Sequence, residues 1–294
     1  MTLRMGLVGT GYWADVAHAA AIGDASSWEL ASVWGRDAER AAALAARHGA
    51  DHAGTDFDEL LSRVDAVAFA VPPALQAELA PRAIAAGKHV ALEKPVALEA
   101  ADARRIAEAA REHDVAAIVM LTMMFDPRMR AIVEETRAGR TWTGGAGLWL
   151  GSALGDENPF NTPWRREELP IWDVGPHALA ALWRTVGPIT EVLSAVEADG
   201  MMHVVFRHEG GATSSCGMTL RAPDAADGFS TLVWGPEGRL ELPVDDVDPR
   251  AAFTTAYEEL AEMIRSGARD HDCDVRFGTR LVEVTAAAEA LVRA

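Results

Sequence analysis

The sequence of 294 residues has few of the features that mark secreted, membrane-spanning or metal-binding proteins. It contains two cysteines, Cys216 and Cys273, which excludes a disulfide framework, and neither stands in a metal-ligand spacing with histidine. No run of about 18 uncharged apolar residues is present, so no membrane span is expected. The first apolar run begins at residue 3, and we therefore expect no signal peptide. These absences favour a cytoplasmic protein without a metal.

Basic residues are also scarce, because 27 Lys and Arg stand against 44 Asp and Glu, which gives a formal net charge of -17. Such a charge repels nucleic acid and anionic membranes, and no local basic patch offsets it. We therefore expect a small-molecule partner, and the overall charge favours a neutral or cationic one. The hydrophobic content of 49% is sufficient for a large core, and the length suggests two domains.

The first apolar run leads directly into a glycine-rich turn, and an Ala-rich segment typical of a helix follows it. The turn consists of Gly9, Thr10, Gly11, Tyr12, Trp13 and Ala14. Gly9 permits a tight turn, Gly11 leaves room for a pyrophosphate, and Ala14 allows close packing of helix and sheet. The helix N-terminus adds free N–H groups and partial positive charge. We predict that all six residues bind a dinucleotide.

The end of the second apolar run, residues 28–34, indicates which nucleotide is bound. No acidic residue stands there to accept a ribose 2'-hydroxyl, and Gly35 and Arg36 follow instead. Arg36 suits a 2'-phosphate through charge-assisted hydrogen bonds, and Gly35 removes a side chain that would collide with it. We therefore predict NADP(H). In the alternative, Arg36 is a solvated charge, Asp37 caps the next helix and NAD(H) is the cofactor.

Short apolar runs alternate with helical segments through the first half of the chain. The runs cover residues 3–8, 29–34, 66–71, 89–92 and 116–121. Such alternation predicts parallel strands with helices on both faces. From about residue 143, strands follow one another with glycine-containing turns between them, which predicts an antiparallel sheet. These later strands are expected at 144–152, 191–198, 201–208, 212–221, 230–235 and 239–242.

The sequence thus predicts an α/β fold with two domains. Residues 1–122 are expected to form a Rossmann dinucleotide-binding domain. Residues 123–294 are expected to form an α+β domain with an open, mostly antiparallel sheet, which binds substrate and pairs with another subunit through its free face. The C-terminal helix is free, on this prediction, to pack back on the first domain.

Two further motifs carry ionisable side chains. The fourth apolar run ends before Glu93-Lys94-Pro95, and the carboxyl ends of parallel strands face the ligand crevice. We therefore expect Lys94 to point at the nicotinamide, held by Pro95, with a cis bond as one form. The alternative is a surface lysine paired with Glu93.

The second motif places Asp173 four residues before His177, where Pro176 begins a helix. This spacing puts both side chains on one helix face. A histidine can take or give a hydroxyl proton near neutral pH, and a nearby carboxylate can orient the imidazole or bind a substrate hydroxyl. In the alternative, Asp173 caps the helix and His177 fills a core position.

The order of these motifs, with Pro163-Trp-Arg165 between them, resembles the glucose-fructose oxidoreductase and inositol dehydrogenase family (Gfo/Idh/MocA) along essentially the whole chain. The resemblance implies an oligomeric oxidoreductase, a homodimer or homotetramer, that acts on a secondary alcohol or ketone carbon of a sugar, cyclitol or related molecule. It implies that Lys94 binds the reacting oxygen, that His177 is the acid/base and that Asp173 supports the substrate and His177. The cofactor then contacts Pro72, Pro73, Glu93 and Lys94, and no metal is needed.

The chain departs from the family pattern at Gln76, where a histidine is frequent, and at Ala180, where an acid is frequent. These departures point to a less hydroxylated substrate than a free hexose. We expect substrate contacts from Met124, Trp164, Arg165 and Trp172, whereas Trp149 is expected in the core or an interface. Two alternatives remain open: a reductase of a non-sugar C=O or C=N bond, and a non-catalytic, cofactor-binding regulatory protein.

Overall fold

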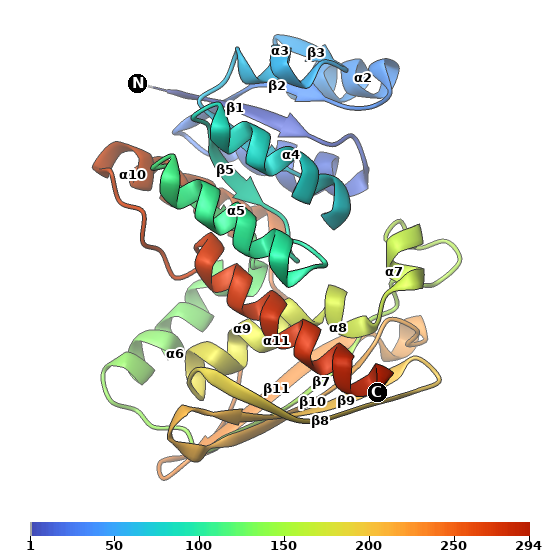
Figure 1. Cartoon of the computed structure of the whole chain (residues 1–294), viewed down its shortest axis with the longest axis vertical. Helices are drawn as coiled ribbons and strands as arrows, with labels where there is room; N and C mark the ends of the chain where they lie inside the picture. The colour runs from blue at the N-terminus through green and yellow to red at the C-terminus, as the bar shows by residue number, and fades with distance from the viewer. Residues whose placement is uncertain (1) are drawn as a thin grey trace. The chain divides into compact units, whose positions relative to one another are not determined.

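The computed structural model describes residues 2–294, which divide into two compact units (Figure 1). The first unit comprises Met1–Met120 and Asp248–Thr279, and the second comprises Leu121–Val247 and Arg280–Ala294. This differs from the expected division at residue 122, because residues 248–279 belong with the first unit. The helix α10 (Pro249–Ser266) explains the difference, since its buried side packs on the helices that follow the first strand.

The first unit contains a six-stranded parallel sheet, as the alternating pattern predicts. Its strands are β1 (Leu3–Val8), β2 (Trp28–Trp34), β3 (His52–Gly54), β4 (Ala66–Phe69), β5 (His89–Leu92) and β6 (Ala117–Val119), in the order β3-β2-β1-β4-β5-β6. The short edge strand β3 was not expected, because it has no apolar run and pairs only with residues 32–34 of β2. The strand that precedes Glu93 is therefore the fifth.

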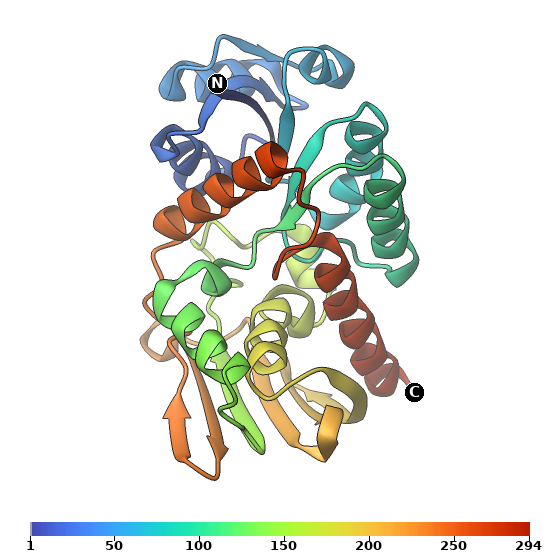
Figure 2. The same cartoon turned by 90° about the vertical axis from the view of Figure 1, so that its left-hand side faces the viewer.

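Helices cover both faces of this sheet (Figures 1 and 2). They are η1 (Ala14–Ala19), α1 (Ala20–Asp24), α2 (Ala38–His48), α3 (Phe57–Leu61), α4 (Pro73–Ala85), α5 (Ala100–Glu112) and α10. From β1 the sheet first grows in one direction, through β2 to β3. The chain then crosses back to β4 on the other side of β1, and the sheet grows in the opposite direction through β5 to β6. Right-handed crossovers in opposite directions put α4 and α5 on one face and η1, α1 and α10 on the other. The strand order reverses between β1 and β4, where dinucleotides bind in such sheets.

The second unit contains a mixed, mostly antiparallel six-stranded sheet, and all six strands expected there are present. They are β7 (Gly144–Leu150), β8 (Ile189–Ala198), β9 (Met201–His208), β10 (Thr213–Thr219), β11 (Gly228–Gly235) and β12 (Gly238–Glu241), in the order β12-β11-β7-β10-β9-β8. Only β7 and β10 pair in parallel. The helices are η2 (Thr122–Phe125), α6 (Pro127–Arg137), α7 (Pro163–Glu167), α8 (Pro170–Asp173), α9 (Gly175–Thr185), η3 (Glu209–Gly211), η4 (Asp224–Ala226) and, in its larger part, α11 (Val275–Arg293).

One face of this second sheet packs against α8 and α9, and the opposite face carries exposed apolar side chains. Trp234 and Leu148 lie on that open face, because the register places Trp234 opposite Gly144 and Leu148 opposite Ser230. The Trp234 ring covers Gly144, since a Cβ there would lie 2.5 Å from it. Exposed apolar side chains on neighbouring strands are typical of a surface that pairs with another protein. No helix in residues 2–294 is long and apolar enough to cross a membrane.

Candidate active site

The glycine-rich turn after β1 has the geometry that its glycines predict. Gly9 has φ +131, and a Cβ there would lie 2.3 Å from the Ala70 carbonyl oxygen, so only glycine fits between β1 and the chain after β4. A Cβ at Gly11 would have no heavy atom within 4 Å, which leaves open space beside bare backbone. Ala14 is fully buried against the sheet. The turn therefore fits a pyrophosphate next to Gly11.

The residues after β2 extend this turn. A Cβ at Gly35 would lie 2.6 Å from Thr10 Cγ2, so Gly35 allows the ends of β1 and β2 to approach closely. The Asp37 carboxylate caps α2 by accepting backbone N–H groups, as one interpretation expected. Arg36 is exposed, and its guanidinium makes no hydrogen bond or ion pair with any residue between 2 and 294. Its donors are thus available to an anionic ligand.

The helix η1 that follows the turn is a π-helix. Hydrogen bonds in a π-helix join residues five apart, and such turns are frequent at functional sites. Trp13 and His18 are five apart and both reach one carboxylate oxygen. The Trp13 indole N–H donates to Glu93 Oε1 over 2.8 Å, and His18 Nε2 lies 2.9 Å from the same atom. The end of β5 is therefore bonded to the segment that follows the glycine-rich turn.

Tyr257 of α10 extends this cluster from the other side of His18. Its hydroxyl oxygen lies 2.6 Å from His18 Nδ1. Burial, reinforced by the charge of Glu93, raises the pKa of Tyr257 well above its usual value, so the hydroxyl keeps its proton and donates to Nδ1. His18 Nε2 is then the donor to Glu93. The second carboxylate oxygen accepts the backbone N–H of Lys94 at 3.0 Å.

Gln76 on α4 fixes the backbone of the same segment. Its side-chain amide is fully buried and donates to the carbonyl oxygens of Glu93 and Val96, while its Oε1 accepts the Glu93 N–H at 2.8 Å. Gln76 therefore binds the backbone of the Glu-Lys-Pro segment, which gives the departure from the family pattern a structural role. Pro72 is the N-cap residue of α4 and Pro73 its first residue, shortly after the end of β4 and next to the strand order reversal.

Lys94 lies at the end of the strand that this network holds. It is the one residue between 90 and 97 that is not buried, and its bond to Pro95 is cis. The Glu93 side chain is bonded to His18, Trp13 and the Lys94 N–H. At the end of β5, the Glu93 carboxylate is therefore buried and hydrogen-bonded, whereas the side chain of Lys94 is partly exposed.

In the second unit, Asp173 is held by Arg165. Asp173 ends α8, and Arg165 Nε donates to its Oδ2 over 2.8 Å. Both side chains are largely buried. No side-chain cap is present at the start of α9, so the interpretation of Asp173 as a helix cap is wrong. Val174 keeps a helical backbone between α8 and α9, and Asp173 and His177 therefore share one side at a spacing of four.

His177 lies in the first turn of α9 and stacks on Trp149 of β7. The two rings are parallel within 6°, with centroids 6.4 Å apart. The Trp149 indole N–H donates to Thr231 Oγ1 over 3.1 Å, which fixes the ring. Between residues 170 and 182, His177 alone is not buried, so it is not a core residue. Trp149, expected only as a core or interface residue, supports the imidazole.

The remaining expected contacts divide between surface and interior. Tyr12 is 51% exposed beside the glycine-rich turn, and Trp164 stacks under the Arg165 guanidinium with 4.5 Å to its ring centroid. Trp172 is buried, and its indole N–H donates to Glu289. The expected substrate contact of Trp172 stays a prediction. Met124 is likewise buried, in η2, and its expected substrate contact also stays a prediction.

The cysteines do not form a thiol site. Both are buried, and burial raises the pKa of the Cys216 thiol to about 12, so this sulfur stays protonated near neutral pH. Among residues 2–294 no group of three or more His, Cys, Asp or Glu side chains is arranged to hold a metal ion.

The fold and the glycine-rich turn define an NAD(P)-binding Rossmann domain followed by a mixed-sheet domain. Residues 3–121 match the oxidoreductase family with an NAD-binding Rossmann fold, GFO_IDH_MocA. Residues 3–121 therefore resemble this family, as the motifs predicted for this part of the chain.

Two curated relatives and one solved structure are similar to the chain. The 4-carboxy-2-hydroxymuconate-6-semialdehyde dehydrogenase of Sphingobium sp. is 36% identical over 139 residues, 47% of this chain and 44% of the relative. The scyllo-inositol 2-dehydrogenase (NADP+) IolU of Bacillus subtilis is 32% identical over 132 residues, 44% of this chain and 40% of the relative. Each match thus spans less than half of the relative's length.

The solved structure of KijD10, a 3-ketoreductase from Actinomadura kijaniata in complex with TDP-benzene and NADP, is similar along the whole chain. It superposes with a TM-score of 0.83 at 19% identity, over 99% of this chain and 98% of the other. At this identity the similarity establishes the fold, including the second, mixed sheet.

Proposed function

We propose that this protein is an NADP(H)-dependent oxidoreductase that transfers a hydride to or from a secondary alcohol or ketone carbon of a sugar, cyclitol or related small molecule. One observation carries the proposal: Trp13 and His18, next to the glycine-rich turn, are bonded to Glu93, which precedes Lys94. The expected phosphate site and the expected catalytic lysine therefore belong to one hydrogen-bonded cluster. The relatives named above, two dehydrogenases and a ketoreductase, support this class of reaction.

The residues of the first unit fit the cofactor. The backbone after Gly9, with the open space at Gly11, would hold the pyrophosphate, and the unpaired guanidinium of Arg36 would hold the 2'-phosphate of NADP(H). When bound, the nicotinamide supplies or accepts the hydride. Gly35 keeps the ends of β1 and β2 close together, so that one cofactor can reach both the pyrophosphate site and Arg36.

The ionisable side chains then carry the proton chemistry. On oxidation, the carbon of a CH–OH group loses a hydride and its oxygen loses a proton, and the ketone results. We assign the oxygen to the Lys94 ammonium, which stabilises alkoxide character, and the proton to His177. Asp173, fixed by Arg165, stabilises the protonated imidazole or binds a neighbouring substrate hydroxyl. Reduction uses the same groups in reverse.

We also propose a cytoplasmic homodimer or homotetramer. The open face of the second sheet supports this, because Leu148 and Trp234 expose apolar surface there that a second copy of the face can bury. This assembly is independent of the assignment of Lys94 and His177.

A substrate screen tests the reaction. Purified protein with NADP+ is assayed for absorbance at ~340 nm, the NADPH band, against sugars and cyclitols, and with NADPH against ketones. Lys94→Ala and His177→Ala are expected to lower turnover by about 100-fold or more with cofactor affinity nearly unchanged. His113→Ala, exposed after α5, is the matched control and is expected to retain turnover. Full turnover in either active-site variant contradicts that residue's role.

A further inference from the structure

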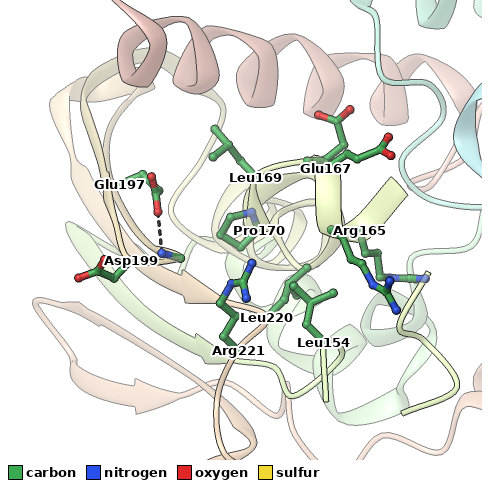
Figure 3. A pocket seen from close by; sticks show the side chains of 12 residues that line it. Leu154, Arg165, Glu167, Leu169, Pro170, Glu197, Asp199, Leu220 and Arg221 are labelled. Atoms are coloured by element: carbon green, nitrogen blue, oxygen red, sulfur yellow. Dashed lines mark hydrogen bonds between the residues drawn. The ribbon is translucent and has the colours of Figure 1, made fainter. Parts of the chain in front are cut away.

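A cavity of about 490 Å³ lies wholly within the second unit (Figure 3). Residues 165–170 around α7 and α8 form one wall, the β8–β9 turn with Glu197 and Asp199 forms another, and Leu220 and Arg221 close it beyond β10. This volume is within the range of small-molecule sites, about 300–1,000 Å³. None of the sequence motifs pointed to the β8–β9 turn or to Arg221.

The cavity contains guanidinium groups without a carboxylate partner. Arg221 makes no side-chain hydrogen bond or ion pair with any residue in the described range 2–294. Arg166 Nε donates to the neutral amide oxygen of Asn161 over 2.6 Å and pairs with no carboxylate in that range. Arg165 is the exception, because Asp173 neutralises it. Two cationic groups in one cavity thus remain available to an anion.

The position of Arg221 is set by its surroundings. Its backbone N–H donates to Thr219 Oγ1 over 3.1 Å. Its side chain lies across Gly200, where a Cβ would come within 2.6 Å of Arg221 Cδ. Gly200 has φ +80, a backbone conformation that favours glycine at this position. Figure 3 shows the Arg221 guanidinium directed towards Pro170, inside the cavity.

Carboxylates line the same cavity without pairing with Arg221. Glu197 accepts the backbone N–H of Gly200 over 2.6 Å, and Asp199 points away from the Arg221 guanidinium (Figure 3). Glu167 lies across the cavity from Arg221. Carboxylates accept hydrogen bonds from hydroxyl groups, whereas guanidinium groups donate to carboxylate and phosphate oxygens. The lining therefore suits a molecule with both hydroxyls and one anionic group.

Arg165 connects this cavity to the candidate acid/base. It lines the cavity and bonds Asp173, which shares one side of the helix with His177. We propose that the cavity binds the carboxylate or phosphate group of a hydroxyl-bearing substrate, with Arg221 and Arg166 as the anion-binding residues. The idea rests on the proposed oxidoreductase function for the reaction, but the anion site itself is defined by this unit alone. It also refines the expectation from net charge, because Arg221 and Arg166 offer guanidinium groups without a carboxylate partner, although Glu167, Glu168, Glu197 and Asp199 line the same cavity.

Calorimetric titration of the full chain without cofactor tests the site. The probes are gluconate, which carries a carboxylate, glucose 6-phosphate, which carries a phosphate, and uncharged glucose. We expect at least one anionic probe to bind about 10-fold more tightly than glucose, which identifies the preferred anion. Arg221→Gln and Arg166→Gln should each remove this preference. Arg239→Gln, an exposed arginine on β12 outside the cavity, should retain it.

The proposal is overturned if the anionic probes bind no more tightly than glucose. It is also overturned if Arg221→Gln, with an unaltered melting temperature, still prefers the anionic probe. A separate titration with NADPH distinguishes this failure from failure of the proposed function. Protein that binds NADPH without preferring anions keeps the oxidoreductase assignment and loses the anion site. Protein that prefers anions and binds no nicotinamide cofactor keeps the site and loses the assignment.

Discussion

His18 Nε2 lies 2.9 Å from Glu93 Oε1, and His18 is fully buried. Tyr257 bonds the other ring nitrogen, so the imidazole joins α10 to the end of β5. Trp13 shares the same carboxylate oxygen. The segment that carries Lys94 is therefore fixed by residues that adjoin the glycine-rich turn.

Removal of the imidazole should destabilise the first unit. In His18→Ala, the Glu93 carboxylate loses a donor and the buried Tyr257 hydroxyl loses its acceptor, which should lower the free energy of unfolding by about 3 kcal/mol. Denaturant unfolding measures the change. His113→Ala, an exposed histidine after α5, should change it by less than about 0.5 kcal/mol. Equal stability of the two variants contradicts the role of the cluster.

Two glycines of one turn should separate folding from cofactor binding. Gly9→Ala places a Cβ 2.3 Å from the Ala70 carbonyl oxygen, in a residue with positive φ. We therefore expect the free energy of unfolding to fall by several kcal/mol. Gly11→Ala meets no atom within 4 Å, and it should retain stability while weakening NADPH binding. Melting temperature and NADPH fluorescence measure the two effects. Unweakened NADPH binding by Gly11→Ala contradicts a pyrophosphate at this position.

Acid sensitivity should depend on His208 of β9. Burial lowers its pKa, with Gly187 O and Ser214 Oγ as its neighbours. The unfolded chain therefore binds a proton near its usual pKa of about 6.5, before the folded protein does. The contribution of the neutral His208 to the free energy of unfolding is therefore fully present above about pH 6.5, and it is lost as the pH falls from there through the lower pKa of the folded state. His208→Asn should lose less stability than wild type between pH 7 and 5, whereas the exposed His203→Asn should match wild type. If the free energy of unfolding of His208→Asn depends on pH as steeply as that of the wild type, this mechanism is ruled out.

The open sheet face predicts the effect of a single charge on assembly. Leu148 is 42% exposed on β7, and Leu291 is 44% exposed on α11. Leu148→Glu puts a charge into the face that we assign to subunit pairing, so sedimentation velocity should show a shift towards monomer. Leu291→Glu is the matched control and should retain the wild-type assembly. A monomeric wild type, or an unshifted Leu148→Glu, refutes pairing through this face.

Local patterns in the sequence predicted most strands, because apolar runs of this length are buried in either sheet. The strand β3 escaped prediction, since His52 to Gly54 contains no apolar run and is held by pairing with β2. The π-helical form of η1 has no local signature in the residues that follow Gly11. The return of α10 to the first unit also depends on packing between distant segments.

The same limit applies to the candidate site. Lys94, Asp173 and His177 stand in motifs with recognisable spacing, whereas His18 and Tyr257 meet across 239 residues of sequence. A histidine in an Ala-rich helical segment was the one local signal for His18. Gln76 was recognised only as a departure from the family, and its role became clear from its bonds to the backbone near Lys94.

The cofactor preference tests the account most directly, through NADPH and NADH fluorescence titrations of wild type and Arg36→Ala. The account predicts tighter binding of NADPH by wild type, a loss of about 10- to 100-fold in Arg36→Ala, and little change for NADH. Arg40→Ala, exposed on α2, should behave as wild type. Tighter NADH binding by wild type, or NADPH affinity that survives in Arg36→Ala, would contradict the assignment of Arg36 and of NADP(H).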